Sequence, residues 1–188
     1  ATTLGRDHQV KAFYRKFIIR PSLNHYILKH FDRSARLLHA GCGGGQVAQD
    51  IGRIIGIAAL DISPEALSLY RKSNKHYREL IHGSIFAMPV GGASYDGIYN
   101  LGVLEHFTEG EIARILAEFH RALKPSGKIV LFWPPEFGLS VIFLKVVHFV
   151  LNRVLKIGIT LHPAEITRIR SRDHVARILM QGGFNLIE

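Results

Sequence analysis

Short apolar runs alternate with segments of helical periodicity through the middle of the chain. Five apolar runs predict buried strands, at residues 36–42, 57–61, 78–84, 95–101 and 128–133. Amphipathic spacing between them predicts helices at residues 46–54, 63–73 and 109–124. Strands and helices that alternate in this way are typical of a parallel sheet covered on both faces. The pattern therefore predicts an α/β fold with a doubly wound sheet.

Residues at the ends of these helices support the assignment. Ser63 is a typical N-cap, because a proline and a glutamate follow it in the first turn. Pro125 ends the third helix, and the Ser126–Gly127 pair is expected to turn the chain into the fifth strand. Outside this core, the remaining expected elements are two basic helices at 7–19 and 22–31, separated at Pro21, a helix at 171–183 and a strand at 184–188.

Three glycines occupy alternate positions just after the first predicted strand. Gly41, Gly43 and Gly45 permit unusual backbone angles there and let a ligand lie against the main chain. Asp61 ends the next strand, and a carboxylate at that place can accept hydrogen bonds from the vicinal hydroxyls of an adenosine ribose. The combination predicts an adenosine-containing ligand at this edge of the sheet.

A nicotinamide dinucleotide is disfavoured as that ligand. The fingerprint G-x-G-x-x-G requires a third glycine at the position that Gln46 occupies. Short-chain dehydrogenases also carry a Tyr-x-x-x-Lys motif, and none of the six tyrosines has a lysine four residues later. The glycine loop therefore favours a different adenosine cofactor.

Four segments, taken together, resemble successive motifs of the class I S-adenosylmethionine-dependent methyltransferases. They are LLHAGCGGGQ (37–46), ALDISPEALSLYRK (59–72), GSIFAMPVGGASYDGIYNLGVLEHF (83–107) and RALKPSGKIVLFWPP (121–135). The similarity is greatest to the small-molecule group typified by ubiquinone and menaquinone biosynthesis methyltransferases. It implies an enzyme with a Rossmann-like, mostly parallel sheet of seven strands. It also implies S-adenosylmethionine as cofactor, with S-adenosylhomocysteine as its product, bound across the carboxyl ends of strands one to four.

The resemblance also implies which residues contact the cofactor. Gly41, Cys42 and Gly43, with Gly45 in the same loop, would contact the methionine part, and Asp61 would contact the ribose. Ile62 would pack on the adenine face, and Ser84 and Ile85 would lie at the adenine edge. Asn100 and Leu101 would lie beside the methionine part and the sulfonium.

Two positions depart from the family pattern. The acid usually found two residues before the first glycine is replaced by His39, and the Asp that usually accepts the adenine amine is replaced by Ser84. A serine hydroxyl offers a neutral hydrogen bond in place of a charge-assisted one, a loss of about 1 kcal/mol. Weaker cofactor binding is expected, and a catalytically silent cofactor-binding or interaction module remains an alternative function.

The substrate is expected to be a small molecule. The stretch from Asn100 to Val103 lacks the Asn/Asp-Pro-Pro-aromatic motif of enzymes that methylate the amino groups of bases. The pI of 9.9 is the only support for the alternative of an RNA methyltransferase. His106 follows the fourth strand and is the candidate catalytic residue, as a general base, unless it only caps the next helix. No histidine has metal-ligand spacing such as His-Glu-x-x-His, so no metal is expected.

The 188 residues fit one domain with four parts. We interpret 1–35 as an N-terminal helical cover, 36–133 as the cofactor-binding core, 134–170 as a helical insertion on the substrate side and 171–188 as the last helix and strand. Within the insertion, residues 134–156 combine a broad apolar face with a narrow polar stripe. This pattern indicates either a helix packed into the core or an apolar lid for an amphiphilic acceptor.

Basic residues are concentrated at two places in the chain. Residues 1–36 carry a net charge of +6 and residues 141–172 a net charge of +5, whereas the middle is nearly neutral. The two basic segments predict peripheral contact with an anionic membrane surface, unless they serve only solubility. A single cysteine and the absence of an N-terminal apolar region predict a cytoplasmic protein. The sequence leaves the oligomeric state open.

Overall fold

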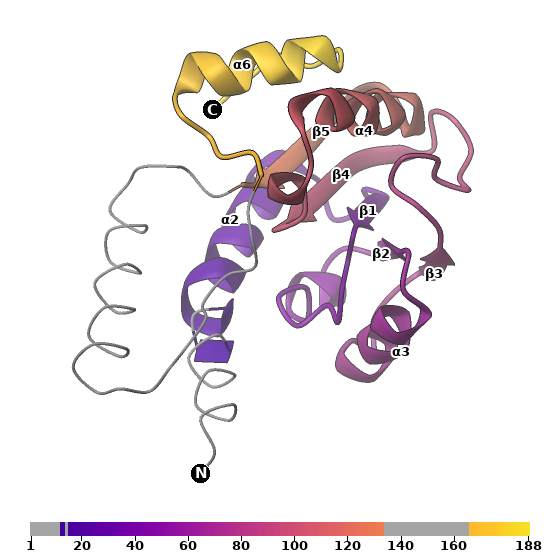
Figure 1. Ribbon diagram of the computed structural model, residues 1–188. Helices are drawn as coiled ribbons and strands as arrows, with labels where there is room; N and C mark the ends of the chain where they lie inside the picture. The colour runs from indigo at the N-terminus through magenta and orange to yellow at the C-terminus, as the bar shows by residue number, and fades with distance from the viewer. Residues whose placement is uncertain (1–11, 14, 134–165) are drawn as a thin grey trace, which may run out of the picture.

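Five parallel strands form one sheet in the computed structural model, which describes residues 12–13, 15–133 and 166–188. The strands are β1 (Leu37–Ala40), β2 (Ile57–Asp61), β3 (Glu79–His82), β4 (Tyr95–Leu101) and β5 (Leu123–Phe132). Their order is β3-β2-β1-β4-β5 (Figure 1). Successive strands are therefore added toward one edge of the sheet up to β3 and toward the other edge from β4 onward, with the switch between β1 and β4. Ligands of open α/β sheets bind beyond the carboxyl ends of the strands at such a switch point.

Helices cover both faces of this sheet. The helices are α2 (Arg20–His30), α3 (Pro64–Ser73), α4 (Glu109–Ala122) and α6 (Arg172–Gln181), and the short turns are η1 (Arg15–Ile19), η2 (Ile51–Arg53) and η3 (Leu104–His106). Buried residues of α2, η2 and α3 share one apolar cluster, and those of α4 and α6 share the other. Figure 1 shows α4 and α6 together on one side of the sheet and α3 on the other. The predicted doubly wound parallel sheet is therefore confirmed.

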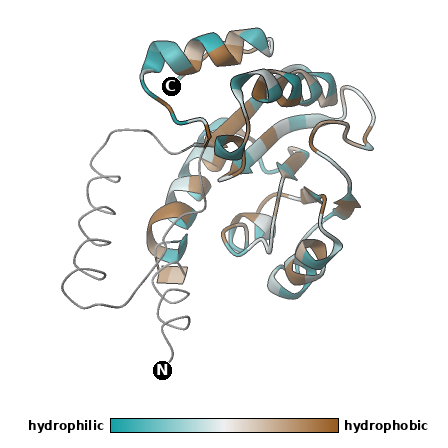
Figure 2. Cartoon of the chain, viewed as in Figure 1, coloured by the Kyte–Doolittle hydropathy of each residue, from teal (hydrophilic) through white to brown (hydrophobic). Residues whose placement is uncertain are grey.

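The central strands β1 and β2 are mostly apolar because both of their faces are buried. In β1, Leu37 belongs to the cluster of α2 and α3, whereas its neighbour Leu38 belongs to the cluster of α4 and α6. Strands covered on both faces show this continuous hydrophobicity. The helices are apolar on one side only, and Figure 2 shows hydrophilic and hydrophobic residues alternating along α4 and α6.

Local signals placed several elements correctly. β2 and β4 have the predicted bounds, and α3 begins after Ser63, whose hydroxyl accepts a hydrogen bond from the Ala66 amide at 3.1 Å. α4 carries a capping box, in which the Thr108 side chain and the Glu111 side chain each satisfy a backbone amide at the start of the helix. These elements follow from residues that are near each other in the sequence.

Two predicted elements are wrong. The helix expected at 46–54 is reduced to the single turn η2; the segment 46–54 contains three β-branched residues and a glycine, which disfavour an α-helix. The strand expected at 184–188 does not form either. There, the Phe184 amide donates to the Leu179 carbonyl at 2.9 Å, and the Glu188 carboxylate accepts from Lys29 Nζ at 2.6 Å. The described residues thus contain five strands, and the sixth and seventh implied by the resemblance are not among them.

Neither Pro21 nor the Ser126–Gly127 pair separates two elements in the way that the sequence predicts. Pro21 lies in the first turn of α2, and η1 runs directly into α2 at Arg20, so Pro21 does not separate two helices. The turn expected at Ser126–Gly127 is an irregularity inside β5, because the pairing with β4 shifts after Leu123 and Ser126 has a φ of +64°. β5 therefore begins earlier than residue 128. The expected helical insertion at 134–170, including its possible lid at 134–156, lies outside the described residues except for residues 166–170.

His39 is a buried polar residue in the middle of the sheet. Its side chain is 2% exposed and stacks on the Tyr99 ring at a centroid distance of 4.3 Å. Nδ1 has no hydrogen-bond partner within the described part of the chain. Burial lowers the pKa of His39 from 6.5 to about 3, so the imidazole stays neutral when the protein is folded.

We predict that His39 makes the fold sensitive to mild acid. In the unfolded chain His39 titrates near 6.5, so below this pH the unfolded state binds a proton that the folded state rejects. Through this one group the free energy of unfolding should fall below pH 6.5, with a slope that approaches about 1.4 kcal/mol per pH unit near pH 5. Urea titrations should show a smaller fall in His39→Phe, whereas His76→Gln, at an exposed histidine, should behave like the unsubstituted protein. Equal slopes in all three would contradict the prediction.

Candidate functional site

A wide cleft lies along the carboxyl ends of the strands. The residues predicted from the sequence that line it are Gly41, Cys42, Gly43, Gly45, Asp61, Ile62, Ser84, Ile85, Leu101 and His106. They come from the segments that follow β1, β2, β3 and β4, and parallel strands end at the same edge of a sheet. The fold therefore gathers in one place residues that are up to 65 positions apart in the sequence.

The glycine loop after β1 needs its glycines for two different reasons. Gly41, Gly43 and Gly45 all have positive φ, at +67°, +51° and +64°. A Cβ atom on Gly43 would meet nothing within 4 Å, so the main chain there is open to a ligand. A Cβ atom on Gly45 would collide with the Tyr70 ring and the Asn74 amide. Gly43 is thus suited to ligand contact, whereas Gly45 lets α3 pack closely.

Asp61 joins the glycine loop to the end of β2. Its Oδ2 accepts a hydrogen bond from the Gly43 amide at 2.8 Å, and its Oδ1 accepts one from the Ser63 amide at 2.9 Å. A carboxylate has about four acceptor positions, two on each oxygen. Both oxygens therefore keep an acceptor position for a ligand while the two amides hold the side chain in place.

Apolar and polar groups both line the cleft beyond Asp61. Ile62 is 69% exposed, which is unusual for a large aliphatic residue, and offers a flat apolar surface. Ser84 lies on the segment after β3, where its hydroxyl accepts a hydrogen bond from the Phe86 amide at 3.2 Å. Ile85 beside it is buried. This arrangement provides one apolar face and one hydroxyl for a planar group.

Asn100 supports the site from behind. Its side chain is buried and does not line the cleft, and its Nδ2 donates to the Ala40 carbonyl at 2.6 Å. The bond ties the end of β4 to the residue that begins the glycine loop. The neighbouring Leu101 lines the cleft directly. The sequence predicts that Asn100 lies beside the cofactor, whereas the structure turns its side chain to Ala40 and leaves Leu101 as the cleft residue of this pair.

Cys42 is not an activated nucleophile. The thiol is buried, and desolvation, reinforced by the charge of Asp61, raises its pKa to about 12. The thiol therefore stays protonated near neutral pH, whereas a cysteine nucleophile reacts as thiolate. No three His, Cys, Asp or Glu side chains gather to hold a metal ion within the described residues.

His106 lies in η3, just after β4, and lines the cleft. Its amide donates to the Val103 carbonyl at 3.2 Å and so closes the short turn. Sequence reasoning missed Glu105 and Phe107 on either side, which also line the cleft. Glu105 is buried, and its carbonyl accepts from the amide of Ile166 at 2.7 Å. The acidic and the aromatic residue that flank His106 in LEHF (104–107) were the available sequence signal for these two cleft residues.

Phe86 is the third cleft residue that sequence reasoning missed. Its ring meets the Phe107 ring edge to face at 5.2 Å, and both line the cleft. The pair joins the segment after β3 to the segment that carries His106. No local pattern could indicate this contact, because the two phenylalanines are 21 residues apart and belong to different loops.

Comparisons with known proteins agree with this geometry. A family model described as a methyltransferase domain matches residues 38–131. The ubiquinone/menaquinone biosynthesis C-methyltransferase of Citrifermentans bemidjiense is 31% identical over 135 residues, which are 66% of this chain and 56% of that protein. The demethylmenaquinone methyltransferase of Chlorobaculum tepidum is 30% identical over 98 residues, 51% of this chain and 39% of that protein. The chain spans about half the length of these curated relatives.

A solved structure shares the fold. The magnesium protoporphyrin IX methyltransferase of Synechocystis, which was crystallised with bound S-adenosylhomocysteine, superposes with a TM-score of 0.65. The match covers 100% of this chain and 80% of that one at 16% sequence identity. The architecture is therefore the Rossmann-like methyltransferase fold, with five parallel strands in the described residues.

Proposed function

Because the chain belongs to the S-adenosylmethionine-dependent methyltransferase family, we propose that it binds S-adenosylmethionine in the cleft and transfers the methyl group to a small acceptor. The observation that carries the proposal is the double anchoring of Asp61 by the amides of Gly43 and Ser63. Each carboxylate oxygen retains one acceptor position, and a ribose presents two vicinal hydroxyls. The free acceptor positions of Asp61 and the open main chain at Gly43 fit this cofactor.

The remaining cleft residues fit the other parts of the cofactor. Gly41, Cys42 and Gly43 would hold the methionine part, with Leu101 beside the sulfonium. The exposed Ile62 would pack on the adenine. Ser84 would meet the adenine amine, because its hydroxyl uses one acceptor position for the Phe86 amide and keeps the other. This neutral contact replaces a charge-assisted one and weakens binding by about 1 kcal/mol.

Methyl transfer depends mainly on alignment. When bound, the cofactor supplies an electrophilic methyl group on its sulfonium, and the protein must hold the acceptor in line and exclude water. Phe86, Phe107 and Trp133 give the cleft an aromatic lining. His106 is the proposed general base where the accepting atom carries a proton, since histidine is the commonest group in that role.

The acceptor is proposed to be apolar or amphiphilic. Two relatives are named for methylating menaquinone or ubiquinone precursors, and the aromatic lining of the cleft favours a similar apolar ring. A catalytically silent module that binds the cofactor without turnover is the alternative, and the replacement of a family acid by Ser84 favours it. The predicted lid at 134–156, which lies outside the described residues, stays part of the proposal.

Turnover separates the enzyme from the silent module. S-adenosylhomocysteine release should be measured with S-adenosylmethionine and a panel of prenylated dihydroxybenzenes. We expect release that depends on one of these acceptors and falls at least tenfold in Asp61→Ala, because Asp61 anchors both the ribose and the loop. Asp32→Ala, at an exposed aspartate outside the cleft, serves as control. Cofactor binding without release for any acceptor would contradict the enzymatic proposal.

We also propose that the N-terminal turn contacts an anionic membrane surface. Phe13, Phe17 and Ile18 are 63%, 53% and 50% exposed, and the basic residues Arg15 and Lys16 lie among them. The two phenylalanine rings pack together at 4.5 Å. Apolar residues flanked by cations are typical of helices that lie in a membrane interface. Among the described residues, no helix is long and apolar enough to cross a membrane.

This N-terminal patch of Phe13, Arg15, Lys16, Phe17 and Ile18 adjoins the cleft, because Arg15 also lines it. An acceptor dissolved in a bilayer would therefore meet the cleft beside the patch. Each Lys or Arg near an anionic surface contributes about 1 kcal/mol, and buried apolar area adds to it.

Liposome sedimentation tests the membrane proposal. The protein should sediment with vesicles that contain phosphatidylserine and not with neutral phosphatidylcholine vesicles, and salt should weaken the association over a Debye length of about 10 Å at 0.1 M. The double variant Phe13→Ser, Phe17→Ser should bind less, whereas Met180→Ser, at an exposed apolar residue of α6, should not. Equal binding by both variants would rule out the N-terminal patch as the membrane contact.

A further inference from the structure

The loop between β3 and β4, residues 83–94, carries the adenine side of the proposed site. Ser84, Ile85 and Phe86 lie at its start and line the cleft. The only ladder contact within the loop is an isolated bridge between Ser84 and Ala87. Something other than strand pairing must therefore keep this loop in one conformation.

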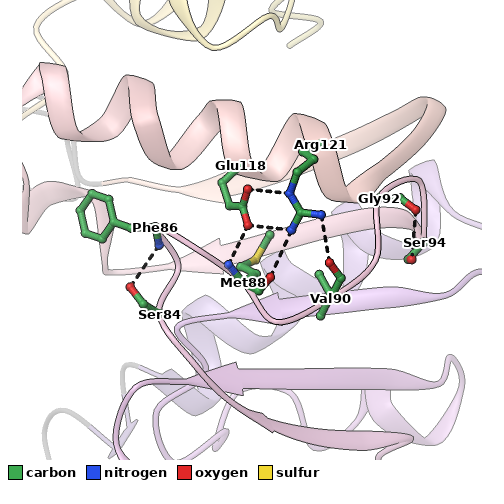
Figure 3. Close-up of polar contacts among 8 residues, drawn as sticks. All are labelled: Ser84, Phe86, Met88, Val90, Gly92, Ser94, Glu118 and Arg121. Atoms are coloured by element: carbon green, nitrogen blue, oxygen red, sulfur yellow. Dashed lines mark hydrogen bonds and ion pairs between the residues drawn. The ribbon is translucent and has the colours of Figure 1, made fainter.

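Two charged residues of α4 hold the loop (Figure 3). The Glu118 carboxylate accepts a hydrogen bond from the Met88 amide at 2.6 Å. The Arg121 guanidinium donates to the Met88 carbonyl at 3.1 Å and to the Val90 carbonyl at 2.9 Å. The clamp formed by Glu118 and Arg121 thus satisfies both backbone groups of Met88.

The two members of the clamp also fix each other. Arg121 Nε and Nη2 donate to the two carboxylate oxygens of Glu118, each at 2.7 Å. This bidentate contact holds the pKa of the Glu118 carboxyl below its usual range. The Glu118 side chain is only 14% exposed, so its charge is partly desolvated and depends on its partner. Planar bidentate geometry leaves little freedom to either side chain.

Further contacts attach both ends of the loop to α4. At the far end, the Ala93 and Ser94 amides donate to the carbonyls of Arg121 and Ala122 at 3.0 and 2.8 Å. At the near end, the Arg114 guanidinium lies over the Phe86 ring at 5.4 Å. The clamp occupies the middle, between these two attachments, and neither Glu118 nor Arg121 lines the cleft.

We infer that Glu118 and Arg121 are positioning residues that pre-organise the Ser84–Phe86 segment for the cofactor's adenine. The inference rests on the proposed function, since it assigns the adenine to that segment. A ligand that binds only one loop conformation loses affinity in proportion to the fraction of molecules that hold it. The clamp keeps this fraction high through backbone contacts alone, at Met88 and Val90, without touching the ligand.

Calorimetry with S-adenosylhomocysteine, together with hydrogen exchange of the Met88 amide, tests the inference. In Arg121→Gln we expect about tenfold weaker binding, because roughly a tenth of the molecules would hold the loop in place. The Met88 amide should exchange faster in this variant without ligand, and saturating ligand should restore its protection. Arg177→Gln, an exposed arginine on α6 away from the cleft, should change neither measurement.

A conservative variant separates positioning from folding. Glu118→Gln retains an acceptor for the Met88 amide but loses the charge, so its affinity should lie between those of Arg121→Gln and the unsubstituted protein. If circular dichroism shows that Arg121→Gln is unfolded, the affinity of Glu118→Gln alone tests the inference. Unchanged affinity in the folded clamp variants, while the unsubstituted protein binds, would overturn the inference alone. Failure of the unsubstituted protein to bind S-adenosylhomocysteine would overturn the proposed function as well.

Discussion

The hydrogen bonds of the Asp61 carboxylate organise the site. One oxygen accepts from Gly43 in the loop after β1, and the other accepts from Ser63 at the start of α3. A single side chain thereby fixes two loops from neighbouring parallel strands. The left-handed conformation of Gly43 presents its amide to this carboxylate and leaves the opposite side open. Without the carboxylate, two partly buried amides would lose their acceptor, at a cost of about 1–3 kcal/mol each.

The rest of the cleft is held by similar contacts between loops and the scaffold. Asn100 fixes the residue before the glycine loop, and the clamp of Glu118 and Arg121 fixes the segment that carries Ser84. In each case a side chain of the scaffold bonds to main-chain groups in a cleft loop or at the end of the strand before it. Sites built in this way need little reorganisation when a ligand binds. The fold thus supplies rigidity that the loops lack on their own.

Features that depend on neighbouring residues were predictable from the sequence. Continuous apolar runs identified β2 and β4, and Ser63 identified the start of α3. The positions of the glycine loop and Asp61 followed from their places after two successive strands. The helix at 46–54 failed because amphipathic spacing was weighed above three β-branched residues and a glycine. The strand at 184–188 failed because its partner contacts come from distant side chains, Lys29 among them.

Contacts between distant residues were beyond sequence reasoning. The sequence singled out Asn100 and Ser84 as ligand residues, but only the fold shows that Asn100 bonds to Ala40 and that α4 holds the loop of Ser84. His39 is a related case, since its departure from the family pattern was visible and its burial against Tyr99 was not. These residues matter through partners that are up to 60 positions away.

The central claim is that Asp61 receives the ribose hydroxyls of the cofactor. The most direct test is a thermodynamic cycle, in which calorimetry compares S-adenosylhomocysteine with its 2′-deoxyribose analogue in the unsubstituted protein and in Asp61→Ala. Disturbance of the loop by the substitution affects both ligands alike and cancels in the ratio of their affinities. The account predicts that the unsubstituted protein prefers the complete ribose by about tenfold or more and that Asp61→Ala shows almost no preference. An equal preference in both proteins would contradict it.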